Sequence, residues 1–160
     1  MSKILKGLSL SAVFLVASLV TVQAFAEVCG VVTTNRDPLN IRKNSSQTAR
    51  VISKAAKDSA LRILNTRGAW YKVKLNNGKV GYGSVDYIRE LTRRTQESCG
   101  IVRTKRTPLN IRKAPSKRGR VIGKAAKGSA LRILGSSGVW YQVILNDGKV
   151  GYARSDYVHR

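Results

Sequence analysis

The residues of this chain that could carry out covalent or acid–base chemistry are few. Its 160 residues include two cysteines, one histidine and eight acidic side chains. A thiolate nucleophile needs a base within reach, and the only histidine, His159, stands beside the last residue. Two cysteines and one histidine are also too few for a zinc finger or a di-metal centre. The sequence therefore offers no metal site, and we expect no cofactor.

The carboxylates give a similar answer. Asp86 and Asp156 each stand just before a tyrosine, and few other acidic residues accompany them. A hydrolase that works with paired carboxylates would place both within one folded unit. We interpret the two aspartates as caps of short turns and expect a protein that is not an enzyme. An enzyme is kept as an alternative hypothesis, in which activity would depend on Cys29, Asp86 or their counterparts.

The chain contains one domain twice. Comparison of the sequence with itself gives a constant offset of 70, and 38 of 61 aligned positions are identical between the segment 29–89 and its copy. Tandem copies of this length indicate a pair of domains rather than a solenoid. The duplication predicts one domain over residues 27–90 and another over 99–160, joined by the polar linker 91–98.

The first 26 residues are typical of a secretory signal peptide. Two lysines precede a short apolar stretch, and Ala24-Phe25-Ala26 has the form of a cleavage site. The stretch is short for a bilayer span, which needs about 20 apolar residues. We expect cleavage before Glu27, export to the periplasm or the extracellular cell envelope, and no stable membrane span in the mature chain.

The two cysteines become informative once export is expected. Disulfides form in oxidising compartments, and Cys29 and Cys99 occupy equivalent positions at the start of each repeat. A bridge between them would close a loop of about 71 residues and stabilise the fold by roughly 4 kcal/mol in the entropic description. A bridge between two chains and a pair of free buried thiols are the alternatives.

Each repeat is predicted to be a small all-β barrel or curled sheet. Segments 60–64 and 71–75 are rich in strand formers, and Asn76-Asn77-Gly78 suits a tight hairpin. Strand alternation places Tyr71 on the apolar face and Trp70 on the other. We therefore expect Trp70 and Trp140 to lie at least partly in solvent, where a large aromatic can anchor a ligand. The alternative is that each tryptophan covers one end of its barrel.

A longer series of motifs points to a family. In the second repeat the series comprises Leu109 to Ser116, Val121 to Gly123, Lys127-Gly128, Leu131 to Leu134, Gly138 to Val143, Asp147 to Tyr152 and Tyr157. The first repeat matches nearly as well, but has Asn44-Ser45-Ser46 where a proline is common. Together the repeats resemble tandem bacterial Src-homology-3 domains. The resemblance implies two five-stranded, partly open barrels and a non-catalytic binding role, often toward peptidoglycan.

The resemblance also implies a ligand groove. In this superfamily a double aromatic and a tyrosine of the terminal turn line it; the matching residues are Trp70, Tyr71, Tyr87, Trp140, Tyr141 and Tyr157. Eukaryotic relatives use an acidic loop to hold a basic, proline-rich peptide. The corresponding region here carries four basic residues, namely Arg36, Arg103, Lys105 and Arg106. We therefore expect an anionic or neutral ligand.

The charge agrees with this expectation. The whole chain carries a formal charge of +22, and the second repeat is more basic than the first. Net charge attracts polyanions without defining a site. The leading hypothesis is an exported protein that binds peptidoglycan or another anionic envelope polymer, and the alternative is an adaptor for a peptide of an envelope or host protein. Basic residues with exposed aromatics also suit nucleic acid, but the export signal argues against that partner.

Overall fold

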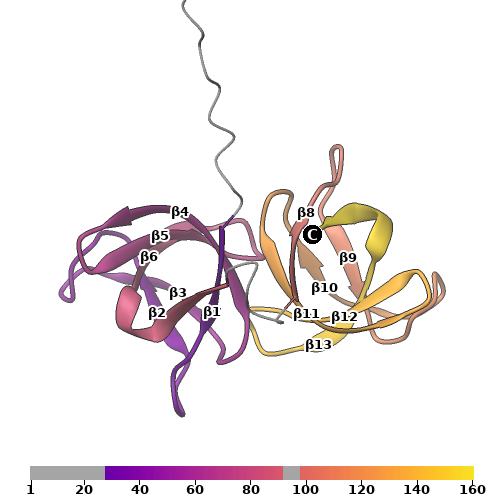
Figure 1. The fold of residues 1–160 in the computed structure, drawn as a ribbon, viewed down its shortest axis with the longest axis horizontal. Coiled ribbons are helices and arrows are strands. Elements are labelled where there is room, and N and C mark those ends of the chain that lie inside the picture. Colours follow the sequence, from indigo (N-terminus) through magenta and orange to yellow (C-terminus); the bar gives the residue numbers. More distant parts are fainter. Residues whose placement is uncertain (1–27, 92–97) are drawn as a thin grey trace, which may run out of the picture.

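The computed structural model describes residues 28–91 and 98–160. It contains two β-barrels side by side, one for each repeat (Figure 1). The first comprises β1 (Val28–Val32), β2 (Leu39–Arg42), β3 (Val51–Ala55), β4 (Ala60–Arg67), β5 (Trp70–Lys74), β6 (Val80–Ser84), the 3₁₀ turn η1 (Val85–Tyr87) and β7 (Ile88–Leu91). The second comprises β8 (Ser98–Val102), β9 (Leu109–Arg112), β10 (Val121–Ala125), β11 (Ala130–Ser137), β12 (Trp140–Ile144), β13 (Val150–Arg154), η2 (Ser155–Tyr157) and β14 (Val158–His159).

The all-β prediction is confirmed, with more strands than the resemblance implied. Each sheet has seven antiparallel strands, in the order β3-β2-β6-β5-β4-β1-β7 in the first barrel. The two additional strands come from the ends of the repeat, where β1 pairs with both β4 and β7. They form because Val32 and Ile88 bury their side chains in the same core while their backbones pair.

The predicted ends of the domains fall partly outside the described residues. The predicted signal peptide 1–26 lies wholly outside them, and so does most of the predicted linker 91–98. The first and last residues of that linker, Leu91 and Ser98, belong to β7 and β8. Among the described residues, no helix is long and apolar enough to cross a membrane.

Period-two alternation builds the core of each barrel. The first core contains Val32, Leu39, Ile41, Ala55, Leu61, Val73, Leu75 and Ile88, all buried, and the second core uses the equivalent positions together with Ala153. The tight hairpins predicted at the Asn-Gly and Asp-Gly turns are present, with Gly78 and Gly148 both at φ +84°. A positive φ is the reason that glycine suits these turns.

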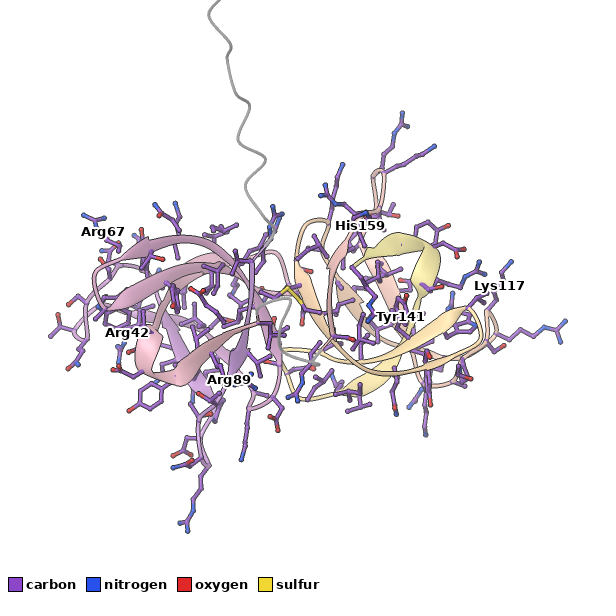
Figure 2. All side chains as sticks on the ribbon, viewed as in Figure 1. Arg42, Arg67, Arg89, Lys117, Tyr141 and His159 are labelled. Carbon is purple, nitrogen blue, oxygen red and sulfur yellow. A yellow bond between two sulfur atoms is a disulfide. The ribbon has the colours of Figure 1, made fainter. Side chains whose placement is uncertain are left out.

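A disulfide joins the two barrels. Cys29 of β1 is bonded to Cys99 of β8, with their Cα atoms 6.5 Å apart (Figure 2). The bridge lies in a small apolar cluster in which Ala60, Ile101 and Ala130 are fully buried. The predicted intramolecular bridge is therefore confirmed, and both alternatives are excluded.

Two asparagines make a reciprocal contact across the same junction. The backbone N–H of Asn76 donates to Oδ1 of Asn146 at 2.6 Å, and the backbone N–H of Asn146 donates to Oδ1 of Asn76 at 2.8 Å. Each side-chain amide donates to a strand carbonyl of the other barrel, Asn76 to Ala130 and Asn146 to Ala60. The backbone carbonyl of Asn76 accepts a hydrogen bond from the N–H of Ala126, and the backbone carbonyl of Asn146 accepts one from the N–H of Ala56. The polar groups of both residues are thus satisfied inside the interface.

At the edge of the junction, two equivalent arginines also reach across to the other barrel. Arg132 of the second barrel forms a salt bridge with Asp58 of the first at 2.9 Å. The equivalent arginine, Arg62, donates to the carbonyl of Gly128, which is the position equivalent to Asp58, at 3.1 Å. The asparagine and arginine contacts therefore occur in both directions, whereas Lys74 donates from Nζ to the carbonyl of Lys127 at 2.8 Å and its equivalent, Ile144, has no such donor.

Replacing either asparagine should destabilise the whole molecule. Asn76→Ala leaves a buried N–H of Asn146 and a buried carbonyl of Ala130 without partners, and each such group costs about 1–3 kcal/mol. We expect the free energy of unfolding, measured in urea with the disulfide intact, to fall by at least about 2 kcal/mol. Asn146→Ala should behave alike, and Asn44→Ala at an exposed loop position is the control. A value for Asn76→Ala within about 0.5 kcal/mol of wild type, the usual range for surface changes, would contradict this account.

Candidate functional site

Each barrel carries an open groove at the equivalent place. The first groove has a volume of about 740 Å³ and lies between the β1–β2 loop (residues 33–38), Trp70 and Tyr87. The second groove, of about 820 Å³, lies between the β8–β9 loop (residues 103–108), Trp140 and Tyr157. The structure therefore brings together four of the six aromatic residues predicted from the sequence.

Backbone contacts hold the loop and the tyrosine of each groove together. The N–H of Thr33 donates to the carbonyl of Tyr87 at 3.0 Å, and the N–H of Arg103 donates to the carbonyl of Tyr157 at 2.8 Å. Each tryptophan begins the strand that pairs with the end of β6 or β13, just before the 3₁₀ turn. The loop, the tryptophan and the turn are thus fixed relative to one another by main-chain geometry.

The predicted turn caps need a correction. Asp86 and Asp156 lie within η1 and η2, and they do not cap them. The first turn is capped by Ser84, whose Oγ accepts from the N–H of Asp86 and donates to its carboxylate at 3.1 Å. The second turn has Arg154 at that position, and its side chain makes no capping bond. Instead, Arg154 forms a salt bridge with Asp156.

The two tryptophans differ in exposure. Trp70 is half-buried, as predicted, but Trp140 is only 7% exposed, so the prediction for Trp140 is wrong. The guanidinium carbon of Arg154 lies 5.7 Å from the centre of the Trp140 ring, within range of a cation–π contact. The first groove has the short Ser84 at the equivalent position, which leaves Trp70 more open. Tyr87 and Tyr157 are 50% and 46% exposed and offer their rings to solvent in both grooves.

Tyr71 and Tyr141 do not line the grooves. Both are partly buried and pack against the barrel cores, on the opposite face of the strand from the neighbouring tryptophans. A hydrogen bond to Glu90, together with burial and the nearby negative charge, raises the pKa of Tyr71. Tyr141 faces a separate hollow of about 360 Å³ beside Arg132 and Arg160. Strand alternation is the physical reason for this placement, and we leave both tyrosines out of the candidate site.

The grooves differ in charge. Two basic and two acidic residues line the first groove, so their formal charges cancel. Five basic residues and one acidic residue line the second, giving a formal charge of +4. Four positions account for the difference, where Thr33, Asn35, Asp37 and Ser84 of the first repeat correspond to Arg103, Lys105, Thr107 and Arg154 of the second. The second groove is therefore the one suited to an anionic ligand.

Sequence reasoning missed a pair of threonines. Thr34 and Thr104 are equivalent residues that line the two grooves, and in each the Oγ1 atom is buried without a hydrogen-bond partner. Buried hydroxyls are normally paired, since an unpaired one costs about 1–3 kcal/mol. The same unpaired hydroxyl occurs at the equivalent position in both copies. The two threonines are identical between the loops, but so are Arg36 and Arg106 and also Pro38 and Pro108, so identity alone did not mark the threonines.

The composition of the grooves suits contact with a ligand. Cys29 and Cys99 are both consumed by the disulfide, so neither provides a thiolate. Within residues 28–91 and 98–160, no three histidine, cysteine or acidic side chains gather as a metal site would require. Each groove instead combines aromatic faces with a few polar groups, the composition usual for a small-ligand or peptide site.

Two small all-β barrels with an aromatic groove on each define a class of small β domain, and comparison with known families makes the class specific. Residues 37–89 and 107–159 each match the bacterial SH3 domain. These two segments make up more than half of the chain, so the protein belongs to the bacterial SH3 domain family.

Individual relatives match more weakly. Over 122 residues the chain is 26% identical to YrvJ of Bacillus subtilis (strain 168), which is named as an N-acetylmuramoyl-L-alanine amidase. The match covers 71% of this chain and 23% of the relative, so the chain spans about a quarter of that protein. Among solved structures, NlpC2 and NlpC1 of Trichomonas vaginalis align over 84% of this chain and 48% and 46% of theirs, at 19% and 20% identity and TM-scores of 0.36.

The exposure of each tryptophan should depend on its neighbour in the groove wall. In a Trp70→Phe background, Arg154→Ser should remove the guanidinium from the Trp140 ring and raise the acrylamide quenching of Trp140 fluorescence at least twofold. The converse change, Ser84→Arg in a Trp140→Phe background, should reduce the quenching of Trp70. Arg120→Ser, at an exposed site outside the groove, is the control for lost charge. Equal quenching of Trp140 with and without Arg154 would show that other atoms cover the ring.

Proposed function

We propose that this protein binds peptidoglycan or another anionic polymer of the cell envelope through its two grooves, without catalysing a reaction. The observation that carries the proposal is one groove design made twice, with a tryptophan, an exposed tyrosine and an unpaired buried hydroxyl at equivalent positions. Aromatic rings offer flat apolar faces, and the hydroxyl offers one directed polar contact. Membership of the bacterial SH3 domain family supports a binding role.

The relative and the charge support the choice of polymer. The name of YrvJ refers to N-acetylmuramoyl-L-alanine, the junction of sugar and peptide in peptidoglycan. Carboxylates and phosphates are the anionic groups of envelope polymers, and the second groove carries the positive charge to attract them. The first groove, without net charge, suits a neutral part of such a ligand.

The disulfide supports a location outside the cytosol. Disulfides persist in oxidising compartments and are rare where thiol reductants are abundant. Cys29 and Cys99 are both committed to the bridge. With the N-terminal segment 1–26, which is typical of a signal peptide, this favours export to the periplasm or the cell envelope.

A co-sedimentation experiment tests the proposal directly. The purified protein is spun with isolated peptidoglycan across a salt series, with DNA as a control polyanion. Tyr87→Ala with Tyr157→Ala should weaken retention on peptidoglycan at least tenfold, because truncation of an exposed aromatic in a binding site costs more than about 1 kcal/mol for each ring. Loss of Tyr157 alone should remove more of the salt-sensitive binding than loss of Tyr87 alone.

The matched control is Leu64→Ala with Leu134→Ala. These leucines are 42% and 45% exposed, equivalent in the two repeats and outside the grooves. If the tyrosine and leucine variants are retained alike, the grooves are not the binding surface. If DNA and peptidoglycan retain the protein equally and this retention vanishes with salt, the binding is explained by the net charge of the protein alone. Absence of binding to both polymers would favour an adaptor for a protein peptide.

Replacing the two threonines should change stability and ligand binding in opposite directions. Valine has nearly the shape of threonine but no hydroxyl, so Thr34→Val and Thr104→Val should raise the free energy of unfolding by about 1 kcal/mol. The same changes should weaken retention on peptidoglycan by about 2- to 10-fold, the equivalent of one lost hydrogen bond in each groove. Thr66→Val, at an exposed site in β4, is the control. If stability rises while retention on peptidoglycan is unchanged, the hydroxyl does not contact the ligand.

A further inference from the structure

The junction between the barrels fixes their relative orientation. A covalent bond joins β1 to β8, and the asparagine pair adds hydrogen bonds in both directions. An apolar cluster centred on Ala60 and Ala130 lies between these contacts, and both residues are fully buried. Because the same interface contains a disulfide, apolar packing and satisfied polar groups, the two barrels form one rigid unit and are not flexibly linked.

The exchange of contacts defines an approximate two-fold axis. The hydrogen bonds of the asparagine pair are exchanged in this way, and so are those of Ala56 and Ala126, whose N–H groups each donate to the backbone carbonyl of the asparagine in the other barrel. Reciprocal contacts of this kind are those of an isologous interface. The second barrel therefore repeats the first after half a turn about an axis through the junction.

The half-turn places the two grooves on opposite sides of the molecule. In Figure 1 the β1–β2 loop, drawn in indigo, extends downward from the first barrel, and the β8–β9 loop, drawn in salmon, extends upward from the second. The turns η1 and η2 likewise lie on opposite outer flanks. Since each groove lies between its loop and its turn, the two grooves lie on opposite sides of the junction.

We propose that the protein is a bivalent linker that joins two separate polymer strands, an inference that rests on the proposed function. A strand lying in the first groove would have to leave it, turn around the molecule and return from the other side to reach the second. Simultaneous engagement of one strand is what raises avidity, and geometry that forbids it removes the gain. Two strands, one on each side, satisfy both grooves without bending.

The two ends of this linker are not alike. The first groove has no net formal charge, and the second carries +4. Attraction at the second groove therefore falls more steeply with salt than attraction at the first. At raised salt the second groove should release its strand first, and linkage should be lost while binding through the first groove persists.

A bead assay separates linkage from binding. Soluble peptidoglycan strands labelled with biotin are immobilised on streptavidin beads, the protein is added, and fluorescent strands of the same preparation follow. Wild type should capture fluorescent strands at moderate protein concentration and lose most of the capture at excess, when each strand is occupied by its own protein molecule. Protein retained on the beads is measured in the same samples.

Single-groove variants are the decisive comparison. Thr34→Val with Tyr87→Ala disables the first groove, and Thr104→Val with Tyr157→Ala disables the second; both variants keep the charge of wild type. Each should still bind the beads but capture less than one tenth of the fluorescent strands, and mixing the two variants should not restore capture. Leu64→Ala with Leu134→Ala should capture as wild type does.

Three outcomes would overturn the proposal. Capture by either single-groove variant at the wild-type level would assign linkage to net charge or to self-association of the protein. Retention of wild type on the beads without capture would leave the proposed function intact and refute the linker. Failure of wild type to bind the beads would refute both.

Discussion

The exchange of hydrogen bonds between Asn76 and Asn146 is the constraint on which the arrangement of this molecule depends. A barrel of about 60 residues buries only about 60% of the surface its unfolded chain exposes, so each repeat alone is marginal. Pressing two such barrels together gains apolar burial, but it also removes hairpin backbone groups from water. Asparagine meets that cost because its side chain both donates and accepts, and at 4% and 7% exposure the pair is fully inside the interface. The disulfide adds to this by joining the barrels covalently beside the same contact.

The two grooves share one backbone frame and differ in their side chains. Both copies keep the loop tied to the terminal turn and the tryptophan at the start of the same strand. The differences are confined to side chains around that frame, and a single change, Ser84 to Arg154, alters charge, turn capping and tryptophan exposure together. Such a change is tolerated because the main-chain hydrogen bonds, and not the side chains, hold the groove open.

Much of the fold could be predicted from the sequence, since duplication and period-two alternation are local signals. The two barrels and the glycine hairpins follow from residue spacing, and the equivalent positions of Cys29 and Cys99 favoured a bridge between them while leaving two alternatives open. The interface asparagines could not be distinguished from ordinary turn residues, because Asn76 stands in a hairpin sequence that already explains an asparagine. Burial of Trp140 was also beyond prediction, since it depends on an arginine fourteen residues away on the neighbouring strand. Alternation alone would have placed Tyr71 with the core, as the structure does; the family resemblance grouped it with the groove.

The rigid junction also bears on what a duplicated binding module can do. Two binding domains joined by a flexible linker can engage one strand at the same time, and the linker sets the effective concentration of the second domain at that strand. In the proposed function a fixed half-turn gives up that gain, because the second groove lies on the opposite side of the junction from the strand bound in the first. Such a junction requires a dedicated set of buried groups, here Ala60, Ala130 and the two asparagines, in positions a tethered pair could leave to solvent. An interface of this kind is consistent with two independent ligands and with no increase in affinity for one. On physical grounds it is the separation of the grooves, more than their number, that distinguishes this arrangement from a simple repetition of one domain.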